Sequence, residues 1–222
     1  MTTIAIIGGG PGLGRAVARR FGREGFDVAL ISRSRQHLDE RVAALSVDGI
    51  NARGYVADGR DGEALARALA DAAGELGPIE VLQWSPVPAR EFMKPVLETS
   101  AEDLVGPIEM SVYGPVNAVQ QVLPGMRELG RGTILLINGG SAVRPGPNVT
   151  GTSVAFAGES AYGQLLHDAL APEGIHVAQL IIPRGISGGE PSHEPEALAD
   201  RIWELHAQHD GDFRTFVEPM DA

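Results

Sequence analysis

The chain contains no cysteine, only one lysine and few aromatic residues. The lack of cysteine excludes disulfides and thiolate metal sites, and we expect no metal centre in this protein. The sequence has no apolar run close to the roughly 20 residues that span a bilayer, and no basic leader precedes its first apolar segment. The lack of cysteine does not by itself indicate the cellular compartment. Together with the other absences, it agrees with a cytoplasmic protein.

Positive charge is also scarce, because 29 acidic residues outnumber 18 basic ones and leave a net charge of −11. Such an excess of negative charge disfavours nucleic acid and anionic membranes as partners. The length of 222 residues suits one domain with a full core, so we expect a single domain over residues 1–222. Arginine supplies every basic residue except Lys94, and this bears on catalysis below.

A glycine-rich turn near the N-terminus is the most informative motif. It follows the apolar run Ile4–Ile7 and precedes apolar residues at helical spacing. In this strand–turn–helix context, glycines allow backbone N–H groups to approach a pyrophosphate, which the helix N-terminus attracts. The alternative is a glycine-rich turn without a ligand. We predict a dinucleotide site formed by Gly8, Gly12, Leu13 and Gly14.

Strand and helix patterns alternate along the whole chain. The predicted strands are Ile4–Ile7, Val28–Ile31, Ala52–Val56, Ile79–Trp84, Thr133–Ile137, His176–Ile182 and Phe213–Val217. Between them, apolar residues at helical spacing predict helices, including long segments over Ala101–Leu129 and Ser153–Leu170. This alternation predicts an α/β fold with a single doubly wound parallel sheet, helices on both faces and ligands at the carboxyl ends of the strands.

Several short motifs occur along the chain in an order and at a spacing that are typical of one protein family. They are Gly8-x-x-x-Gly12-x-Gly14, Ala57-Asp58, Gly77–Leu82, Val122–Met126, Arg131–Ile134, Arg144–Pro147 and Leu170–Val177. With these motifs the chain resembles the short-chain dehydrogenase/reductase family over essentially its whole length. The resemblance implies a Rossmann-type fold, a nicotinamide dinucleotide cofactor and oxidoreductase chemistry on a small organic molecule.

The resemblance also implies where the catalytic residues should lie, and there the sequence departs from the family. The family uses a Tyr-x-x-x-Lys pair, a Ser and an Asn, and the lysine lowers the pKa of the tyrosine that donates a proton. At the family's spacing the corresponding residues are Thr152 for Tyr, Phe156 for Lys, Gly139 for Ser and Ser111 for Asn. The chain is therefore similar to an atypical member that lacks the catalytic pair.

No other alignment restores this pair. If one helical turn is deleted from the alignment, Phe156 aligns with the family's Tyr and Ser160 with its Lys, so the pair is still missing. The single lysine, Lys94, lies on the loop after the fourth strand, far from the required position. The fourth strand ends in Trp84-Ser85-Pro86-Val87 instead of the family's Asn-Asn-Ala-Gly, and Gly188 replaces its threonine after the sixth strand. We therefore expect ordinary ketones and alcohols to react slowly or not at all.

The chain matches the cofactor-binding motifs of the family better than it matches the catalytic ones. Relatives that prefer NAD carry an Asp at the end of the second strand, where this chain has Arg33 and Ser34, which suit a 2′-phosphate. A solvated loop charge is the alternative for Arg33. Asp58 resembles the residue that binds the adenine amino group, and Pro183 and Ile186 follow the sixth strand in the cofactor region. The resemblance favours NADP(H) over NAD(H).

The replacement for the missing proton donor stays open. The catalytic candidates are Ser141, Thr152, Tyr162 and Ser111, and the candidate substrate-pocket residues are Trp84, Ser85 and Phe156. Turn capping is the alternative for Ser141, and core packing or an interface is the alternative for Tyr162. Surface exposure is expected for His206 and His209. His193 is expected to be solvated in the irregular segment Gly185–Pro195, with substrate contact as the alternative.

Three functions follow from these observations. The first is an NADP(H)-dependent oxidoreductase that acts by a non-standard mechanism, for example on an activated alkene or iminium. The second is a non-redox enzyme on the same scaffold, such as a cyclase, dehydratase or isomerase. The third is a catalytically silent cofactor-binding or scaffold protein, because a fold alone does not determine function.

We also expect a homodimer or homotetramer. Two helices carry apolar stripes: Val116, Val119, Val122 and Leu123 on one, and Tyr162, Leu165, Leu166 and Ala169 on the other. Each stripe spreads beyond the single face that a helix buries against a sheet, and two-fold symmetry can pair it with its own copy. Pro107 and Pro115 should interrupt and kink the first of these helices.

Overall fold

The computed structural model describes residues 2–208 and 211–220. Its strands are β1 Thr3–Ile7, β2 Asp27–Ser32, β3 Ala52–Val56, β4 Ile79–Trp84, β5 Gly132–Gly139, β6 Ile175–Ile182 and β7 Arg214–Phe216. Its α-helices are α1 Leu13–Arg23, α2 Arg35–Val47, α3 Gly62–Leu76, α4 Ala101–Ile108, α5 Gly114–Leu129, α6 Thr150–Leu170 and α7 Pro195–Ala207. In the part of the chain described, no helix is long and apolar enough to cross a membrane.

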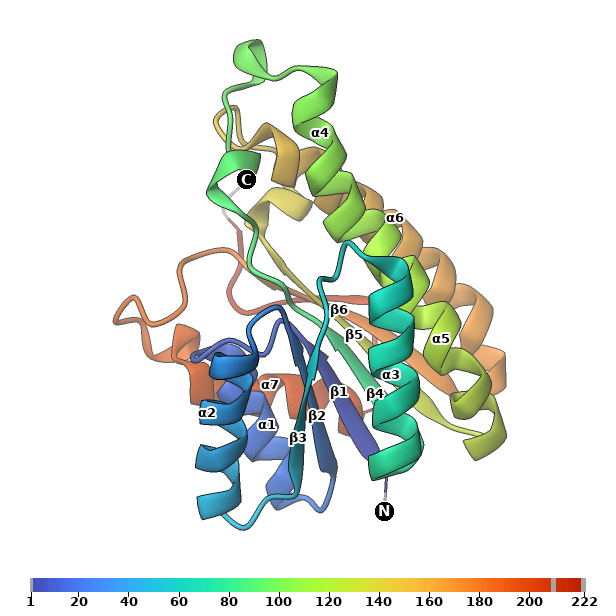
Figure 1. Ribbon diagram of the computed structural model, residues 1–222. Coiled ribbons are helices and arrows are strands. Elements are labelled where there is room, and N and C mark those ends of the chain that lie inside the picture. The colour runs from blue at the N-terminus through green and yellow to red at the C-terminus, as the bar shows by residue number, and fades with distance from the viewer. Residues whose placement is uncertain (1, 209–210, 221–222) are drawn as a thin grey trace.

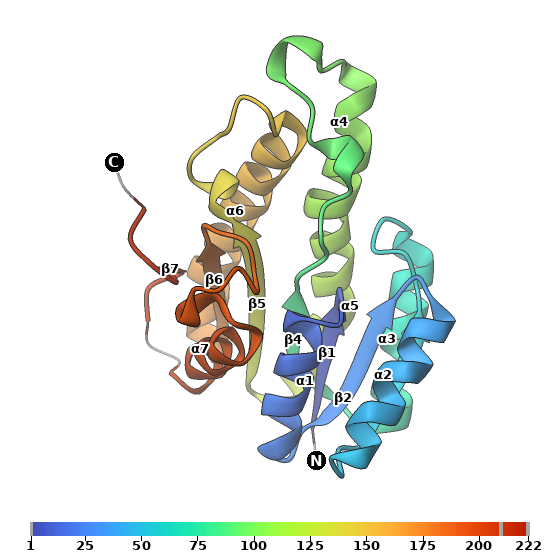
Figure 2. The ribbon, with the colours of Figure 1, turned by 90° about the vertical axis from the view of Figure 1, so that its left-hand side faces the viewer.

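The strands form one parallel sheet in the order β3-β2-β1-β4-β5-β6-β7. Helices α1, α2 and α7 cover one face, and α3, α5 and α6 cover the other (Figure 1 and Figure 2). A buried apolar cluster fills each interface, and β1, β4 and β6 are buried along their whole length. The prediction of a doubly wound parallel sheet is confirmed.

Local capping signals determine where several helices begin and end. Ser34 and Asp61 accept backbone N–H bonds at the starts of α2 and α3, and Ser100 forms a reciprocal capping box with Asp103 at the start of α4. Helix α5 ends on Gly130, whose φ of 65° lies in the left-handed region that favours glycine. The caps at Ser34, Asp61 and Ser100 lie on the loops that follow the carboxyl ends of β2, β3 and β4, whereas Gly130 precedes the amino end of β5.

The order of the strands reverses between β1 and β4. Strand β1 pairs with β2 on one side and with β4 on the other, which opens a crevice at their carboxyl ends. The turn after β1 lies so close to the loop after β4 that a Cβ on Gly8 would sit 2.5 Å from the Ser85 carbonyl oxygen, at a φ of +93°. A Cβ on Gly14 would sit 2.7 Å from the Gly9 Cα. Only glycine fits at Gly8 and Gly14, so the turn requires these two glycines of the motif.

The long helical segment after β4 stays helical past both prolines. Pro107 lies in the last turn of α4 and Pro115 in the first turn of α5, and a π-helical turn, Glu109–Tyr113, joins the two helices. The prolines interrupt the α-helical hydrogen bonding as expected, and the wider π turn accommodates the interruption. As a result α4 continues α5 beyond the carboxyl ends of the strands (Figure 1).

Two predictions about the helices need correction. Helix α6 begins at Thr150, earlier than its predicted start. Val119 and Val122 of α5 are buried in the core, so this predicted stripe is not a free surface. On α6, Tyr162 also packs against the core, whereas Leu165 is 68% exposed.

Candidate functional site

Two cavities meet at the glycine turn, at the carboxyl ends of the strands. The larger, of about 580 Å³, extends over the loops that follow β4, β5 and β6. The smaller, of about 400 Å³, lies over the ends of β2 and β3. Both cavities are lined by Gly8, Gly10, Pro86 and Val87. One elongated ligand that crosses the turn can therefore occupy both.

The turn between the cavities suits a pyrophosphate. Helix α1 begins there at Leu13, and its first turn carries no acidic side chain, so its N–H groups and partial positive charge favour an anion. A Cβ built on Gly12 meets no atom within 4 Å, so the backbone at Gly12 is open to the cavity. Gly12, Leu13 and Gly14 all line the larger cavity. The residues present therefore fit a dinucleotide.

Cationic side chains line the smaller cavity where β2 ends. Arg33 and Arg41 lie there together with Ser34 and His37, and the residues directly after β2 include no carboxylate. The Ser34 hydroxyl oxygen accepts a bond from the His37 backbone N–H at 3.3 Å, which leaves the hydroxyl proton available to donate. A guanidinium and a hydroxyl are donors that suit a phosphate monoester.

Asp58 lies on the wall of this cavity after β3, where Arg60 holds it. The Arg60 guanidinium donates to the two Asp58 carboxylate oxygens at 3.3 and 3.1 Å, and the Arg60 backbone N–H donates at 3.0 Å. Partial burial acts to raise the pKa of Asp58, but the bonds from Arg60 outweigh it and lower this pKa below its usual value. Asp58 is therefore an ionised acceptor in a fixed orientation.

The larger cavity brings together five of the positions that the sequence analysis assigned to catalysis or to the substrate pocket. They are Ser85, Gly139, Ser141, Thr152 and Phe156. The Thr152 hydroxyl donates to the Val149 carbonyl oxygen at 3.0 Å, and the Ser85 hydroxyl donates to the Ile7 carbonyl oxygen at 3.2 Å. Both protons are committed to the backbone. The Ser141 hydroxyl has no hydrogen-bond partner among the described residues, so it remains available to a ligand.

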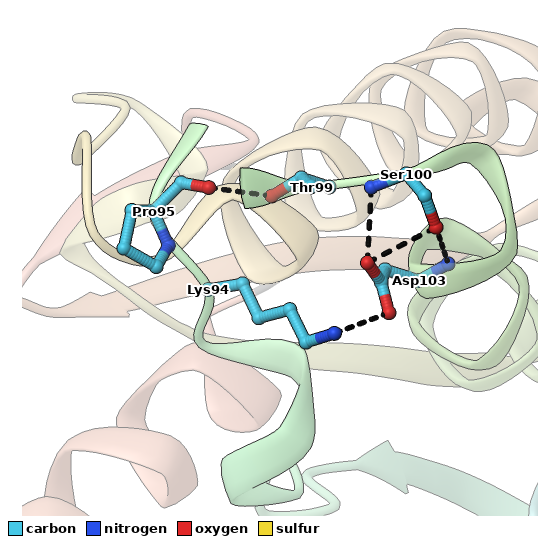
Figure 3. A network of polar contacts seen from close by, with 5 residues as sticks. All are labelled: Lys94, Pro95, Thr99, Ser100 and Asp103. Atoms are coloured by element: carbon cyan, nitrogen blue, oxygen red, sulfur yellow. Dashed lines mark hydrogen bonds and ion pairs between the residues drawn. The ribbon is translucent and has the colours of Figure 1, made fainter. Parts of the chain in front are cut away.

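The only lysine of the chain is engaged elsewhere. Lys94 Nζ lies 2.7 Å from Asp103 Oδ1, and the other oxygen of this carboxylate accepts from the Ser100 N–H at the start of α4 (Figure 3). The hydrogen bonds from Lys94 and Ser100 lower the pKa of Asp103 to about 2. Lys94 does not line the larger cavity, so it anchors the β4–α4 loop instead of tuning an acid in the site.

Four other predicted site residues do not line either cavity. They are Trp84, Ser111, Tyr162 and Pro183. Trp84 is 2% exposed, and its ring lies so close to Gly114 that a Cβ there would clash with it. The prediction that Trp84 is a substrate-pocket residue is wrong, because the ring is turned into the core. The core packing of Tyr162 matches the alternative reading of that residue.

The surface positions predicted for two histidines are also wrong. His206 is buried on the face of α7 that carries Leu198 and Ile202, with its Nδ1 2.9 Å from Thr133 Oγ1. His193 is fully buried, and its Nδ1 lies 3.0 Å from Ser192 Oγ. The helical spacing of Leu198, Ile202 and His206 was a signal for burial of His206. His209 lies outside the described residues.

A row of hydrogen-bonded side chains, buried except for the partly buried Arg214, leads to the larger cavity, and sequence reasoning missed it. Arg214 Nε donates to Gln179 Oε1 at 2.7 Å, and Gln179 Nε2 donates to Asn138 Oδ1 at 2.8 Å. Asn138 Nδ2 then donates to Glu159 Oε1 at 3.0 Å. Asn138 lines the cavity, whereas Glu159 is 1% exposed and lies deeper on α6. This row connects β7, β6 and β5 to α6.

Glu159 is an acid held in an unusual environment. Burial raises its pKa to about 8, although hydrogen bonding with Asn138 and Ser111 acts to lower it. Its Oε2 has no hydrogen-bond partner among the described residues. The carboxyl is therefore mainly neutral at pH 7. Helical spacing places Glu159 on the same face of α6 as Phe156 and Gly163, both buried, and this was the one signal that could have revealed it.

Comparisons with known proteins agree with this architecture. The sequence model of the family described as short chain dehydrogenase matches residues 2–188. The human dehydrogenase/reductase SDR family member 4 is 27% identical over 166 residues, which are 75% of this chain and 59% of that protein. The chain thus spans about three fifths of the length of this curated relative.

Two solved structures share the fold over nearly the whole chain. A short-chain dehydrogenase from Rhodopseudomonas palustris is 26% identical, with a TM-score of 0.87 and coverage of 99% of both chains. A metagenomic short-chain oxidoreductase in complex with NADP is 20% identical, with a TM-score of 0.85 and coverage of 99% of this chain and 97% of that one. At this identity the second comparison supports the fold alone.

Proposed function

The chain belongs to the short-chain dehydrogenase family, and from this premise we propose that it is an NADP(H)-dependent oxidoreductase with a non-standard catalytic site. The observation that carries the proposal is the pair of cavities joined at Gly8, of which the smaller is lined by Arg33 and Arg41. Members of the family bind nicotinamide cofactors, which supply or accept a hydride when bound. The metagenomic structure with the same fold holds NADP.

Each part of the cofactor has a matching group of residues. Gly8, Gly12, Leu13 and Gly14 face the pyrophosphate, and Arg33 and Ser34 bind the 2′-phosphate. Asp58, fixed by Arg60, accepts a hydrogen bond from the adenine amino group. Pro183 and Ile186, after β6, flank the nicotinamide end, and of these two Ile186 lines the larger cavity. The preference for NADP(H) rests on the guanidinium of Arg33 and on the missing carboxylate after β2.

In the proposed alignment, Thr152 and Phe156 stand at the family's Tyr and Lys positions, so the site offers no Tyr–Lys pair as an acid. We therefore propose a reaction that needs little acid catalysis. The Thr152 hydroxyl is committed to a backbone carbonyl, and the Phe156 ring adds apolar surface to the cavity. Ser141 keeps a hydroxyl that can bind a substrate oxygen. A substrate that accepts hydride at an activated carbon, such as a conjugated alkene or an iminium, fits such a site better than a simple ketone.

The proposal includes an assembly of two or four copies of a single-domain chain that works in the cytoplasm. The exposed face of α6 carries Val154, Ala157, Ala161, Leu165 and Ala169, which are small or apolar. This face replaces the pair of stripes expected from the sequence, because the α5 stripe is buried against the sheet. A two-fold axis at α6 can bring this face against its own copy.

Cofactor titration followed by a substrate panel tests the proposed function. We expect NADPH to quench or enhance protein fluorescence at lower concentrations than NADH, and conjugated enones or iminium ions to consume NADPH faster than simple ketones. Binding of NADPH without any substrate-dependent oxidation across the panel would point to a non-redox enzyme on this scaffold. Absence of binding to either cofactor would overturn the proposal.

A further inference from the structure

The side-chain row behind the larger cavity has a fixed direction of hydrogen bonding. A guanidinium can only donate, so the oxygen of the Gln179 amide must face Arg214. The nitrogen of the same amide then donates to Asn138 Oδ1 at 2.8 Å and to Ser160 Oγ at 2.6 Å. The Asn138 amide is therefore oriented with its oxygen toward Gln179 and its nitrogen toward Glu159, and a flip would break both bonds.

This orientation leaves one N–H group of Asn138 without an acceptor. Asn138 Nδ2 carries two N–H groups, and one of them donates to Glu159 Oε1 at 3.0 Å. Among the described residues none accepts the second. Asn138 lines the larger cavity and is only 3% exposed, so bulk water gives little compensation. A buried donor without an acceptor costs free energy that a ligand oxygen can restore.

Apart from the free hydroxyl of Ser141, the rest of the cavity offers few competing side-chain donors. The hydroxyl protons of Ser85 and Thr152 are committed to backbone carbonyls, and Arg184 Nε pairs with Glu218 at 2.5 Å. Most other lining residues are apolar, and they include Pro86, Val87, Met93, Ile137, Phe156 and Ile182. An uncharged, largely apolar molecule with one hydrogen-bond-accepting oxygen matches this lining.

We propose that Asn138 donates its second side-chain N–H to a carbonyl-type oxygen of an uncharged, largely apolar substrate, and that Glu159 is the positioning residue for this amide. The proposal rests on the proposed function, since it assigns a polar contact to the substrate of the same cavity. Glu159 acts through Asn138, because it does not line the cavity itself. A donor fixed before the ligand arrives binds an oxygen without a further cost of ordering.

Glu159 is kept neutral by its burial, and no cation bonds to it among the described residues. Asn138 faces it from β5 and Ser111 from the π turn, and neither carries a charge. The cation of the row, Arg214, bonds to Gln179 and not to Glu159. Ionisation of Glu159 places a buried carboxylate beside Asn138, and this carboxylate competes with the ligand for the amide N–H groups. Ligand binding through Asn138 therefore depends on the proton of Glu159.

A pair of probes that differ by the oxygen tests the role of Asn138. We compare 2-cyclohexen-1-one with cyclohexene for binding to the protein saturated with NADP⁺, by calorimetry or saturation-transfer NMR. The wild-type protein should prefer the enone by about tenfold, as expected for one buried hydrogen bond. Asn138→Leu should abolish this preference, and the control Asn51→Leu, at an exposed residue that lines neither cavity, should keep it. Equal binding of the two probes to the wild-type protein overturns the proposal, whether or not Asn138→Leu folds.

The pH dependence of the same preference tests the role of Glu159. The preference of the wild-type protein for the enone should fall as the pH rises through about 8, and in Glu159→Gln it should not change with pH. A wild-type preference independent of pH shows that Glu159 is only structural and overturns its positioning role. NADPH titration of each variant separates the two proposals: if NADPH binds while the probes bind equally, the proposed function stands and this inference fails.

Discussion

The carboxyl of Glu159 accepts a hydrogen bond of 3.0 Å from the side-chain amide of Asn138, and both side chains are almost completely buried. This acid has no cation bonded to it among the described residues, and burial raises its pKa to about 8. The folded protein therefore holds a proton on Glu159 that the unfolded chain releases near the ordinary value of 4.5.

The first prediction is that this proton makes stability depend on pH. Between the ordinary pKa of 4.5 and the folded pKa of about 8, the folded state binds one more proton than the unfolded state. The contribution of Glu159 to stability therefore falls as the pH rises through this window, by ~1.4 kcal/mol per pH unit. Glu159→Gln removes the titration, so its stability relative to the wild-type protein should increase with pH.

Urea unfolding of both proteins across this pH range measures the difference. The matched control is Glu63→Gln, which removes a carboxyl from the exposed first turn of α3. Its stability relative to the wild-type protein should stay nearly constant over the same range. A constant difference for Glu159→Gln would mean that Glu159 is ionised in the folded protein.

The second prediction concerns the 2′-phosphate. Arg33→Ala should weaken NADPH binding by ~1.5–3 kcal/mol, the range for a hydrogen bond to a charged group, and should leave NADH binding almost unchanged. Arg35→Ala is the matched control, because Arg35 bonds to the Gly54 carbonyl and Asp39 and does not line the smaller cavity. Fluorescence titration of both cofactors measures the effects, and an equal loss of NADH affinity would contradict the assignment.

The third prediction is that simple ketones are poor substrates. Among the described residues, none that lines the larger cavity is an acid, and general acid catalysis typically contributes ~10²–10⁴-fold to a rate. A panel of simple ketones should therefore oxidise NADPH at least ~10²-fold more slowly than a family enzyme with the Tyr–Lys pair. If rapid reduction were observed, Ser141→Ala should lower it, whereas Tyr162→Phe should not, because Tyr162 lies in the core.

The fold could be predicted because its signals are local. Apolar runs such as Ile4–Ile7 and His176–Ile182 mark buried parallel strands, and the glycine-rich turn is recognisable between a strand and a helix. Thr152 and Phe156 became site candidates through the family's spacing from the Leu170–Val177 motif, and both line the larger cavity. In these cases the sequence of one short segment is enough to predict its structure or its place in the site.

The parts that were missed depend on contacts between distant segments. Glu159 and Asn138 lie 21 residues apart, and neither residue type predicts burial by itself. Trp84 could be placed at the end of a strand, but the direction of its ring depends on the space left by Gly114. Likewise His193 is buried, but the irregular segment around it has no helical or strand periodicity in its sequence that could have predicted this burial.

The fourth prediction concerns Lys94, which pairs with Asp103 at 2.7 Å on the loop before α4. Lys94→Met should leave NADPH affinity and turnover unchanged, because the ammonium lies outside both cavities. Its cost in stability should stay below ~1 kcal/mol, since the Lys94 side chain is 45% exposed and water screens the ion pair. Ser100→Ala, which removes the cap of the same helix, should cost ~1 kcal/mol. A large loss of turnover in Lys94→Met would assign the lysine to the site.

The last prediction concerns assembly through α6. Leu165 is 68% exposed in the centre of a face that also carries Ala161 and Ala169, so a charge at this position should prevent two copies from packing there. We expect the wild-type protein to be a dimer or tetramer by light scattering and Leu165→Asp to be a monomer. Val47→Asp is the control, because Val47 is 89% exposed at the end of α2, on the opposite side of the sheet. A wild-type protein that stays at about 23 kDa at micromolar concentration would show that α6 is a solvent-exposed face of a monomer.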